Sequence, residues 1–124
     1  MSDARPPQAA DLPALAAAEG GPVRGVRWAL VPDGALNANL VEFPAGEGVG
    51  EHVNDEVDVL IAGVDGDGVV VVDGVEHPVG PGRLVLVPRG ARRATRARSA
   101  RFAYLTVHRR RERLHLPQRA EAGG

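Results

Sequence analysis

The sequence of 124 residues contains no cysteine, and aromatic side chains make up only 3% of it. Without cysteine the protein forms no disulfide, offers no thiolate to a metal and has no cysteine nucleophile. Because aromatic residues are scarce, the core has to be built from aliphatic side chains. No apolar run reaches membrane-spanning length, and the N-terminal residues lack the apolar core of a signal peptide. The sequence therefore predicts a cytoplasmic protein without a membrane partner.

Lysine is absent too, so arginine supplies all fifteen of the positive side chains other than histidine, and the arginines are unevenly spread. Residues 1–76 carry fourteen acids and three arginines, a net charge of −11, whereas residues 77–124 carry two acids and twelve arginines, a net charge of +10. A basic half can indicate nucleic-acid binding, but no aromatic residues interleave with these arginines and no DNA-binding motif accompanies them. We therefore expect no nucleic-acid partner, and we expect acidic and basic strands to lie side by side in one fold.

Glycine and proline are abundant instead, with sixteen and ten residues, and they divide the chain into short segments. This composition favours short strands and tight turns over long helices. The strongest local signal is Asp73-Gly74, which is typical of a two-residue type I′ hairpin turn and sets Val72 opposite Val75. Eight or more short strands at regular spacing predict an all-β sandwich or barrel.

The chain divides by composition into three parts. Residues 1–22 are rich in alanine and proline and form a predicted N-terminal arm, in which Asp11 is placed to cap a short helix that runs through Glu19. Residues 23–109 hold the predicted strands, and residues 110–124 form a polar, basic C-terminal tail. We therefore expect a single domain.

A polar segment around His52 stands just before an apolar run. If residues 52–58 form a strand, alternate side chains share a face, so His52, Asn54, Glu56 and Asp58 lie on one side. An imidazole, an amide and two carboxylates on one face can bind a hard or borderline divalent cation. Polar alternation on the solvent face of a strand is commoner, and the spacing alone does not decide between the two.

The residues around this segment resemble the first sequence motif of the cupin family. Gly46, five further residues and then His52 fit that motif, and Asn54 stands where the family has a second histidine. The family's glutamate has two candidates here. Asp58 has the right spacing from His52, whereas Glu56 has the right spacing from the glycine that ends the motif.

A second cupin motif is matched downstream. Gly82, Pro88 and Gly90 have the motif's spacing, and Arg93 stands at its histidine position. The resemblance covers residues 24–108 and implies a cupin-type double-stranded β-helix, or jelly-roll barrel, with a short flexible or helical N-terminal arm. It also implies a homodimer, because cupins commonly pair through their sheets.

The resemblance implies a changed metal site. Cupins that hold a metal typically use three histidines and one glutamate on the inner wall of the barrel, and of those histidines this chain has only His52. Arg93 would add a permanent positive charge beside the site. We therefore expect no metal; if Fe, Mn, Ni or Zn is bound, the ligands are His52, Asn54, Glu56 and Asp58.

The function expected from this reading is binding of a small, anionic organic ligand inside the barrel. Without a metal, Arg93 is expected to pair with Glu56 or Asp58. The candidate ligand-binding residues are His52, Asn54, Glu56, Asp58, Arg93, Tyr104 and His108.

Two alternatives stay open. One is a cupin enzyme of isomerase, cyclase, lyase or dioxygenase type, with His52 or Glu56 as the catalytic base. The other is a structural module that serves dimerisation. The sequence names no substrate and does not decide whether the protein is catalytic, because this fold hosts many activities.

Overall fold

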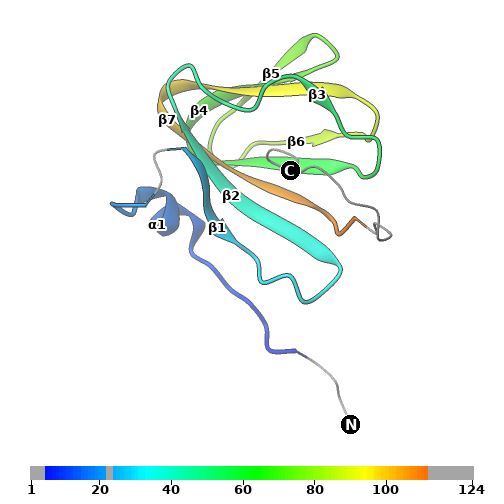
Figure 1. Ribbon diagram of the computed structural model, residues 1–124. Helices are drawn as coiled ribbons and strands as arrows, with labels where there is room; N and C mark the ends of the chain where they lie inside the picture. The colour runs from blue at the N-terminus through cyan, green and yellow to red at the C-terminus, as the bar shows by residue number, and fades with distance from the viewer. Residues whose placement is uncertain (1–4, 22–23, 112–124) are drawn as a thin grey trace.

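The structure is a computed structural model that describes residues 5–21 and 24–111. This part of the chain forms one short helix and seven strands, and the strands make an antiparallel sheet that curls into a barrel (Figure 1). The elements are α1 (Leu12–Ala17), β1 (Gly25–Ala29), β2 (Leu36–Pro44), β3 (His52–Val53), β4 (Val59–Val72), β5 (Val75–Val79), β6 (Leu84–Val87) and β7 (Arg92–Arg109). The predicted all-β barrel with a helical arm is confirmed.

The predicted arm (residues 1–22) and tail (residues 110–124) are only partly described. Residues 1–4 and 22 of the arm and residues 112–124 of the tail lie outside the described residues. The domain boundaries therefore stay a prediction.

β7 occupies the centre of the sheet, whose strands follow the order β1, β2, β7, β4, β5, while β3 pairs with β7 and β6 pairs with β4. The predicted count of eight or more strands is wrong, because β4 and β7 are each one long strand where two short ones are expected. In β4 the register shifts between Gly63 and Asp65 and between Gly66 and Gly68. Such β-bulges bend a strand without ending it.

The hairpin between β4 and β5 has the predicted turn and register. Asp73 and Gly74 have φ angles of 48° and 83°, the positive values that a type I′ turn needs at both central residues. Val72 lies opposite Val75. The prediction from Asp73-Gly74 is therefore confirmed.

The interior of the barrel is filled mainly by aliphatic side chains. The two aromatic rings of Phe102 and Tyr104 lie among them, with ring centroids 5.0 Å apart. The buried members of this core are Val41, Val57, Val59, Ile61, Val70, Val79, Val87, Ala97, Phe102 and Tyr104. The aliphatic core expected from the composition is confirmed.

A second, smaller apolar layer lies between α1 and the outer face of the sheet (Figure 1). Its members are Leu12, Leu15, Ala16, Trp28, Leu40, Val64, Ala103 and Leu105. Asp11 caps α1 as predicted, because its carboxylate accepts the N–H of Ala14 at 3.2 Å, but the helix ends at Ala17 rather than at Glu19. No helix in the described part of the chain is long and apolar enough to cross a membrane.

Three charged side chains, Arg27, Glu42 and Arg101, tie α1 to the sheet, and we call them the arm cluster. Glu42 is 5% exposed, and its carboxylate lies 3.8 Å from Nε of Arg27 and 3.2 Å from Nε of Arg101. Arg101 also donates to the carbonyl of Ala16 at 2.7 Å. Arg27 donates to the carbonyl of Leu15 at 3.3 Å. Because the last carbonyls of a helix lack partners within it, these bonds stabilise the end of α1.

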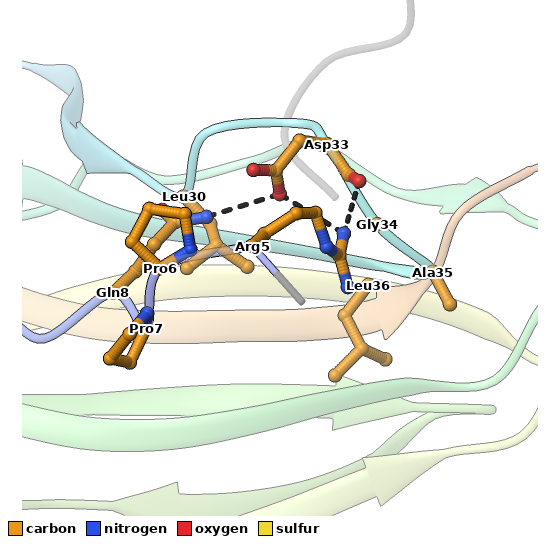
Figure 2. A pocket seen from close by; sticks show the side chains of 9 residues that line it. All are labelled: Arg5, Pro6, Pro7, Gln8, Leu30, Asp33, Gly34, Ala35 and Leu36. Atoms are coloured by element: carbon orange, nitrogen blue, oxygen red, sulfur yellow. Dashed lines mark hydrogen bonds and ion pairs between the residues drawn. The ribbon is translucent and has the colours of Figure 1, made fainter. Parts of the chain in front are cut away.

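The residues before α1 are held against the loop between β1 and β2 (Figure 2). Oε1 of Gln8 accepts the N–H of Val31 at 2.8 Å, and its Nε2 donates to the carbonyl of Val31 at 3.2 Å. Arg5 pairs with the carboxylate of Asp33 at 3.2 Å. These residues border a cavity of about 590 Å³, in which the two charged groups neutralise each other. We therefore assign this region to attachment of the arm.

The charge split along the chain is balanced by strand pairing. Arg98 on β7 pairs with Glu76 on β5 at 2.8 Å. Arg101 pairs with Glu42 on β2 as described above. β2 and β7 lie side by side as expected, whereas β5 and β7 are separated by β4 and are joined by an ion pair across it.

Candidate functional site

The polar part of the barrel interior is built on the long strand β7. Oγ1 of Thr95 lies 2.9 Å from the hydroxyl of Tyr104, and both residues are buried. Nine residues of straight strand would span about 30 Å. The contact therefore requires β7 to bend sharply, so that its two halves face each other across the interior.

Both halves of β7 place alternate side chains in the interior of the barrel. Arg93 lies one inward position before Thr95, and Thr106 lies one inward position after Tyr104; both are buried. A cavity of about 370 Å³ lies at the C-terminal end of β7, and we call this end of the barrel the mouth. The cavity is lined by Glu56, Val57, Asp58, Arg89 and Arg109. Arg93 and Thr106 therefore extend the inward-facing polar residues of β7 beyond Thr95 and Tyr104, toward the two ends of the strand.

Tyr104 stays protonated in this setting. Burial raises the pKa of its hydroxyl to about 12, and the bond to Thr95 and the positive charge of Arg93 oppose that rise only in part. At neutral pH Tyr104 therefore keeps a neutral hydroxyl inside the barrel, bonded to Thr95.

Two buried polar atoms of this region have no hydrogen-bond partner among the described residues: Nδ2 of Asn54 and Oγ1 of Thr106. Asn54 is 7% exposed and Thr106 is 2% exposed. The amide oxygen of Asn54 is used, because it accepts the backbone N–H of Glu56 at 2.9 Å. Leaving a buried donor or acceptor unpaired costs about 1–3 kcal/mol, so such atoms mark a place where a polar ligand would be stabilised.

The prediction of one polar strand face over residues 52–58 is wrong beyond Val53, where β3 ends. The side chain of Asn54 captures backbone N–H groups and forms a turn that competes with strand pairing. After this turn Val57 faces the interior, and Asp58 is exposed. Oδ1 of Asp58 accepts the backbone N–H of Arg89 at 2.8 Å.

Glu56 lies half-buried at the mouth. Its carboxylate is 3.5 Å from Nε of Arg111, so the two form an ion pair. Arg111 comes two residues after the end of β7. The expected pairing of Arg93 with Glu56 or Asp58 stays a prediction, although the exposure of Asp58 weighs against that partner.

His52 and His108 are oriented by backbone carbonyls. Nδ1 of His52 is 2.9 Å from the carbonyl oxygen of Gly50, and Nδ1 of His108 is 2.9 Å from that of Arg109. A carbonyl oxygen only accepts, so Nδ1 carries the hydrogen in each case. In the neutral ring of His52 the lone pair is then on Nε2, where it can accept a proton or bind a ligand.

The residues present do not fit the usual cupin metal. In the described part of the chain, no group of three or more His, Cys, Asp or Glu side chains is arranged to hold a metal ion. The oxygen of Asn54 is already used by the backbone N–H groups of Glu56 and Val57. Arg93, at the position of a ligand histidine, cannot lose its charge and repels a dication.

Three polar residues of this site are absent from the sequence prediction: Thr95, Thr106 and Arg111. Strand alternation could have found the two threonines, because Thr95 shares the inward face of Arg93 and Thr106 shares that of Tyr104. Nothing local identifies Arg111, which lies beyond the last predicted strand. Its place beside Glu56 depends on the path of β7 across the barrel.

A sequence profile of the cupin domain family matches residues 39–108. A search of curated proteins found no significant match.

Solved structures share the fold. The chain is similar to a protein from Thermus thermophilus at 24% identity, with a TM-score of 0.68, over 84% of this chain and 98% of the other. It is similar to a cupin protein from Bacteroides fragilis at 16% identity, with a TM-score of 0.65, over 95% of this chain and 93% of the other. It is also similar to a predicted oxalate decarboxylase from Thermotoga maritima at 19% identity, with a TM-score of 0.56, over 59% of this chain and 64% of the other. At these identities the likeness concerns the fold alone.

Proposed function

This chain belongs to the cupin domain family, and from that premise we propose that it binds a small anionic organic molecule inside the barrel without the usual metal. The observation that carries the proposal is Arg93, which is 3% exposed on the inner face of β7. It stands at the position where the cupin motif has a histidine.

The chemistry around Arg93 supports an anion rather than a cation. A guanidinium group is always charged and binds a carboxylate or phosphate through two parallel hydrogen bonds. Nδ2 of Asn54 is a buried donor that has no hydrogen-bond partner among the described residues. Tyr104 adds a neutral hydroxyl on the same strand. Together these groups offer positive charge and hydrogen-bond donors where other cupins offer metal ligands.

The first test is a thermal-shift screen of small carboxylates and phosphates, repeated with a chelator present. A binding anion raises the melting temperature with the logarithm of its concentration, and the chelator leaves that rise unchanged. Arg93→Lys keeps the charge but removes the planar fork, so we expect about tenfold weaker binding.

The matched control is Arg98→Lys, because Arg98 lies on the same strand, is exposed and pairs with Glu76. We expect its ligand affinity to equal that of the unchanged protein. Stoichiometric metal in protein purified without chelator, lost on His52→Ala, would overturn the metal-free proposal.

The second candidate function is a cupin enzyme with His52 as the base, and the bond from Nδ1 of His52 to the Gly50 carbonyl favours it. One structural neighbour bears the description of a predicted oxalate decarboxylase, which makes small carboxylic acids the first substrates to try. If His52 is catalytic, His52→Gln abolishes turnover while the ligand still raises the melting temperature. Unchanged turnover in that variant would rule His52 out.

The homodimer and the cytoplasmic location expected from the sequence also remain predictions. Leu84 and Leu86 on β6 are 60% and 55% exposed, which is unusual for neighbouring leucines on a strand. We expect Leu86→Lys to convert a dimer into a monomer in analytical ultracentrifugation, because it would place a charge in an apolar contact. A dimer that survives this change uses another surface.

A further inference from the structure

The mouth of the barrel contains arginine side chains that do not form ion pairs with its carboxylates. The mouth cavity is lined by two acidic side chains, Glu56 and Asp58, and by two arginines, Arg89 and Arg109. An adjoining cavity of about 170 Å³ adds Asp55 and Arg111 to the same set. The charges are balanced in number, so their pairing decides what the site can bind.

Both carboxylates of the mouth cavity have partners other than Arg89 and Arg109 side chains. Glu56 forms its ion pair with Arg111 at 3.5 Å. Asp58 accepts a main-chain N–H, that of Arg89, at 2.8 Å. The guanidinium groups of Arg89 and Arg109 thus form no ion pair within the described residues.

These two guanidinium groups are exposed and border one cavity. Like charges that share a cavity repel each other, and a bound anion relieves that repulsion while accepting charge-assisted hydrogen bonds from both groups. Arg98, on the same strand as Arg109, is a contrasting case, because an ion pair with Glu76 neutralises its charge. The mouth therefore has the chemistry of an anion site that no carboxylate of the described residues fills.

The mouth adjoins the segment that carries Arg93. Arg93 lies opposite His52 on β3, and the N–H of Gly90, next to Arg89, donates to the carbonyl of Asn54 at 2.7 Å. We propose that the ligand is a dianion, a dicarboxylate in the simplest case, with one anionic group at Arg93 and the second held at the mouth by Arg89 and Arg109. This inference rests on the proposed function and makes it more specific.

The test compares dicarboxylates from malonate to adipate with the monocarboxylates of the same carbon number, by isothermal titration calorimetry at constant ionic strength. We expect at least one dicarboxylate to bind the unchanged protein about tenfold more tightly than its matched monocarboxylate, since it gains a second charge-assisted contact. In Arg89→Met and Arg109→Met this preference is expected to fall to about twofold, and the monocarboxylate affinity to stay the same.

The control is Arg83→Met, which removes the same charge from an exposed position at the other end of β6 from Arg89. It is expected to leave the preference unchanged. Melting temperatures show that each variant folds; the Asp58 bond to Arg89 survives substitution because it uses the backbone.

The outcomes separate the two proposals. If both kinds of acid bind equally, the dianion inference is wrong and the proposed function stands. If the preference persists in both mouth variants, the second group is bound elsewhere and the inference is also wrong. If neither kind of acid binds, the proposed function itself fails.

Discussion

The arm cluster and the mouth both bring charged side chains together, but they use them differently. In the arm cluster, Glu42 meets Arg27 and Arg101, and the same guanidinium groups take up backbone carbonyls at the end of α1. Around the mouth, Asn54 and Thr106 each keep a buried polar atom without a partner. Oε1 of Glu42 also lacks a hydrogen-bond partner within the described residues, but it lies 3.8 Å from the charge of Arg27. A cluster of opposite charges holds the fold together, whereas buried polar atoms that have neither a hydrogen bond nor a counter-charge are suited to a ligand.

The largest effect that separates the two regions is expected from Glu42→Gln. The variant removes the carboxylate charge that lies beside the buried guanidinium group of Arg27, whose side chain is 8% exposed. Breaking a buried ion pair in this way costs about 3 kcal/mol. Urea unfolding measures the loss.

The control for this prediction is Glu47→Gln, which removes an exposed carboxylate that pairs with Arg24. The pKa of Glu47 is lowered by its hydrogen bond to Arg24, yet water screens this pair, so we expect a much smaller loss of stability. Equal losses in the two variants would show that burial does not distinguish the arm cluster from the surface.

The second effect concerns pH and the hydroxyl of Tyr104. Burial raises its pKa from 10.0 to about 12, so the folded chain keeps a proton that the unfolded chain loses. The stabilisation that the protonated hydroxyl gives the folded state is complete below pH 10 and is lost as the pH rises toward 12. The free energy of unfolding should therefore fall over this range more steeply than in Tyr104→Phe, as urea titrations at each pH can measure.

At neutral pH, Tyr104→Phe removes only the hydrogen bond to Thr95, and we expect a loss of about 1 kcal/mol. If the free energy of unfolding changes with pH in the same way in both proteins, water reaches the hydroxyl of Tyr104 in the folded state.

The smallest effect on stability is expected from Thr106→Val. Valine has the shape of threonine without the unpartnered hydroxyl, so the free energy of unfolding should stay the same or rise by up to about 1 kcal/mol. Thr95→Val is the matched control, because its hydroxyl is bonded to Tyr104, and it should lose about 1 kcal/mol. A loss in Thr106→Val as large as in the control would show that Thr106 has a partner and that the mouth resembles the arm cluster.

The fold could be predicted from the sequence where local chemistry decides it. The hairpin at Asp73-Gly74 and the helix cap at Asp11 each depend on residues within one turn. The spacing of Gly82 and Pro88 likewise pointed to the cupin family, which the profile match supports. These parts of the prediction are confirmed.

The site could be predicted only in part, because strand alternation is reliable only while the strand continues. Asn54 interrupts it by bonding the N–H of Glu56, and Asp58 then falls on the outside. Arg111 meets Glu56 only because a bent strand returns the chain to the mouth. Long-range contacts of this kind are set by the tertiary fold, which the local pattern of residues does not contain.

The central place of β7 also has a consequence for how the protein is made. In the described part of the chain, β1 and β2 have no hydrogen-bonded connection to β4, β5 and β6 except through β7. A ribosome synthesises β7 last, so the nascent chain must hold two separate half-sheets with open edges until residue 109 has left the exit tunnel. A premature stop codon just before β7 would therefore leave a polypeptide with most of its residues and no completed barrel, which is the kind of product that chaperones and proteases remove.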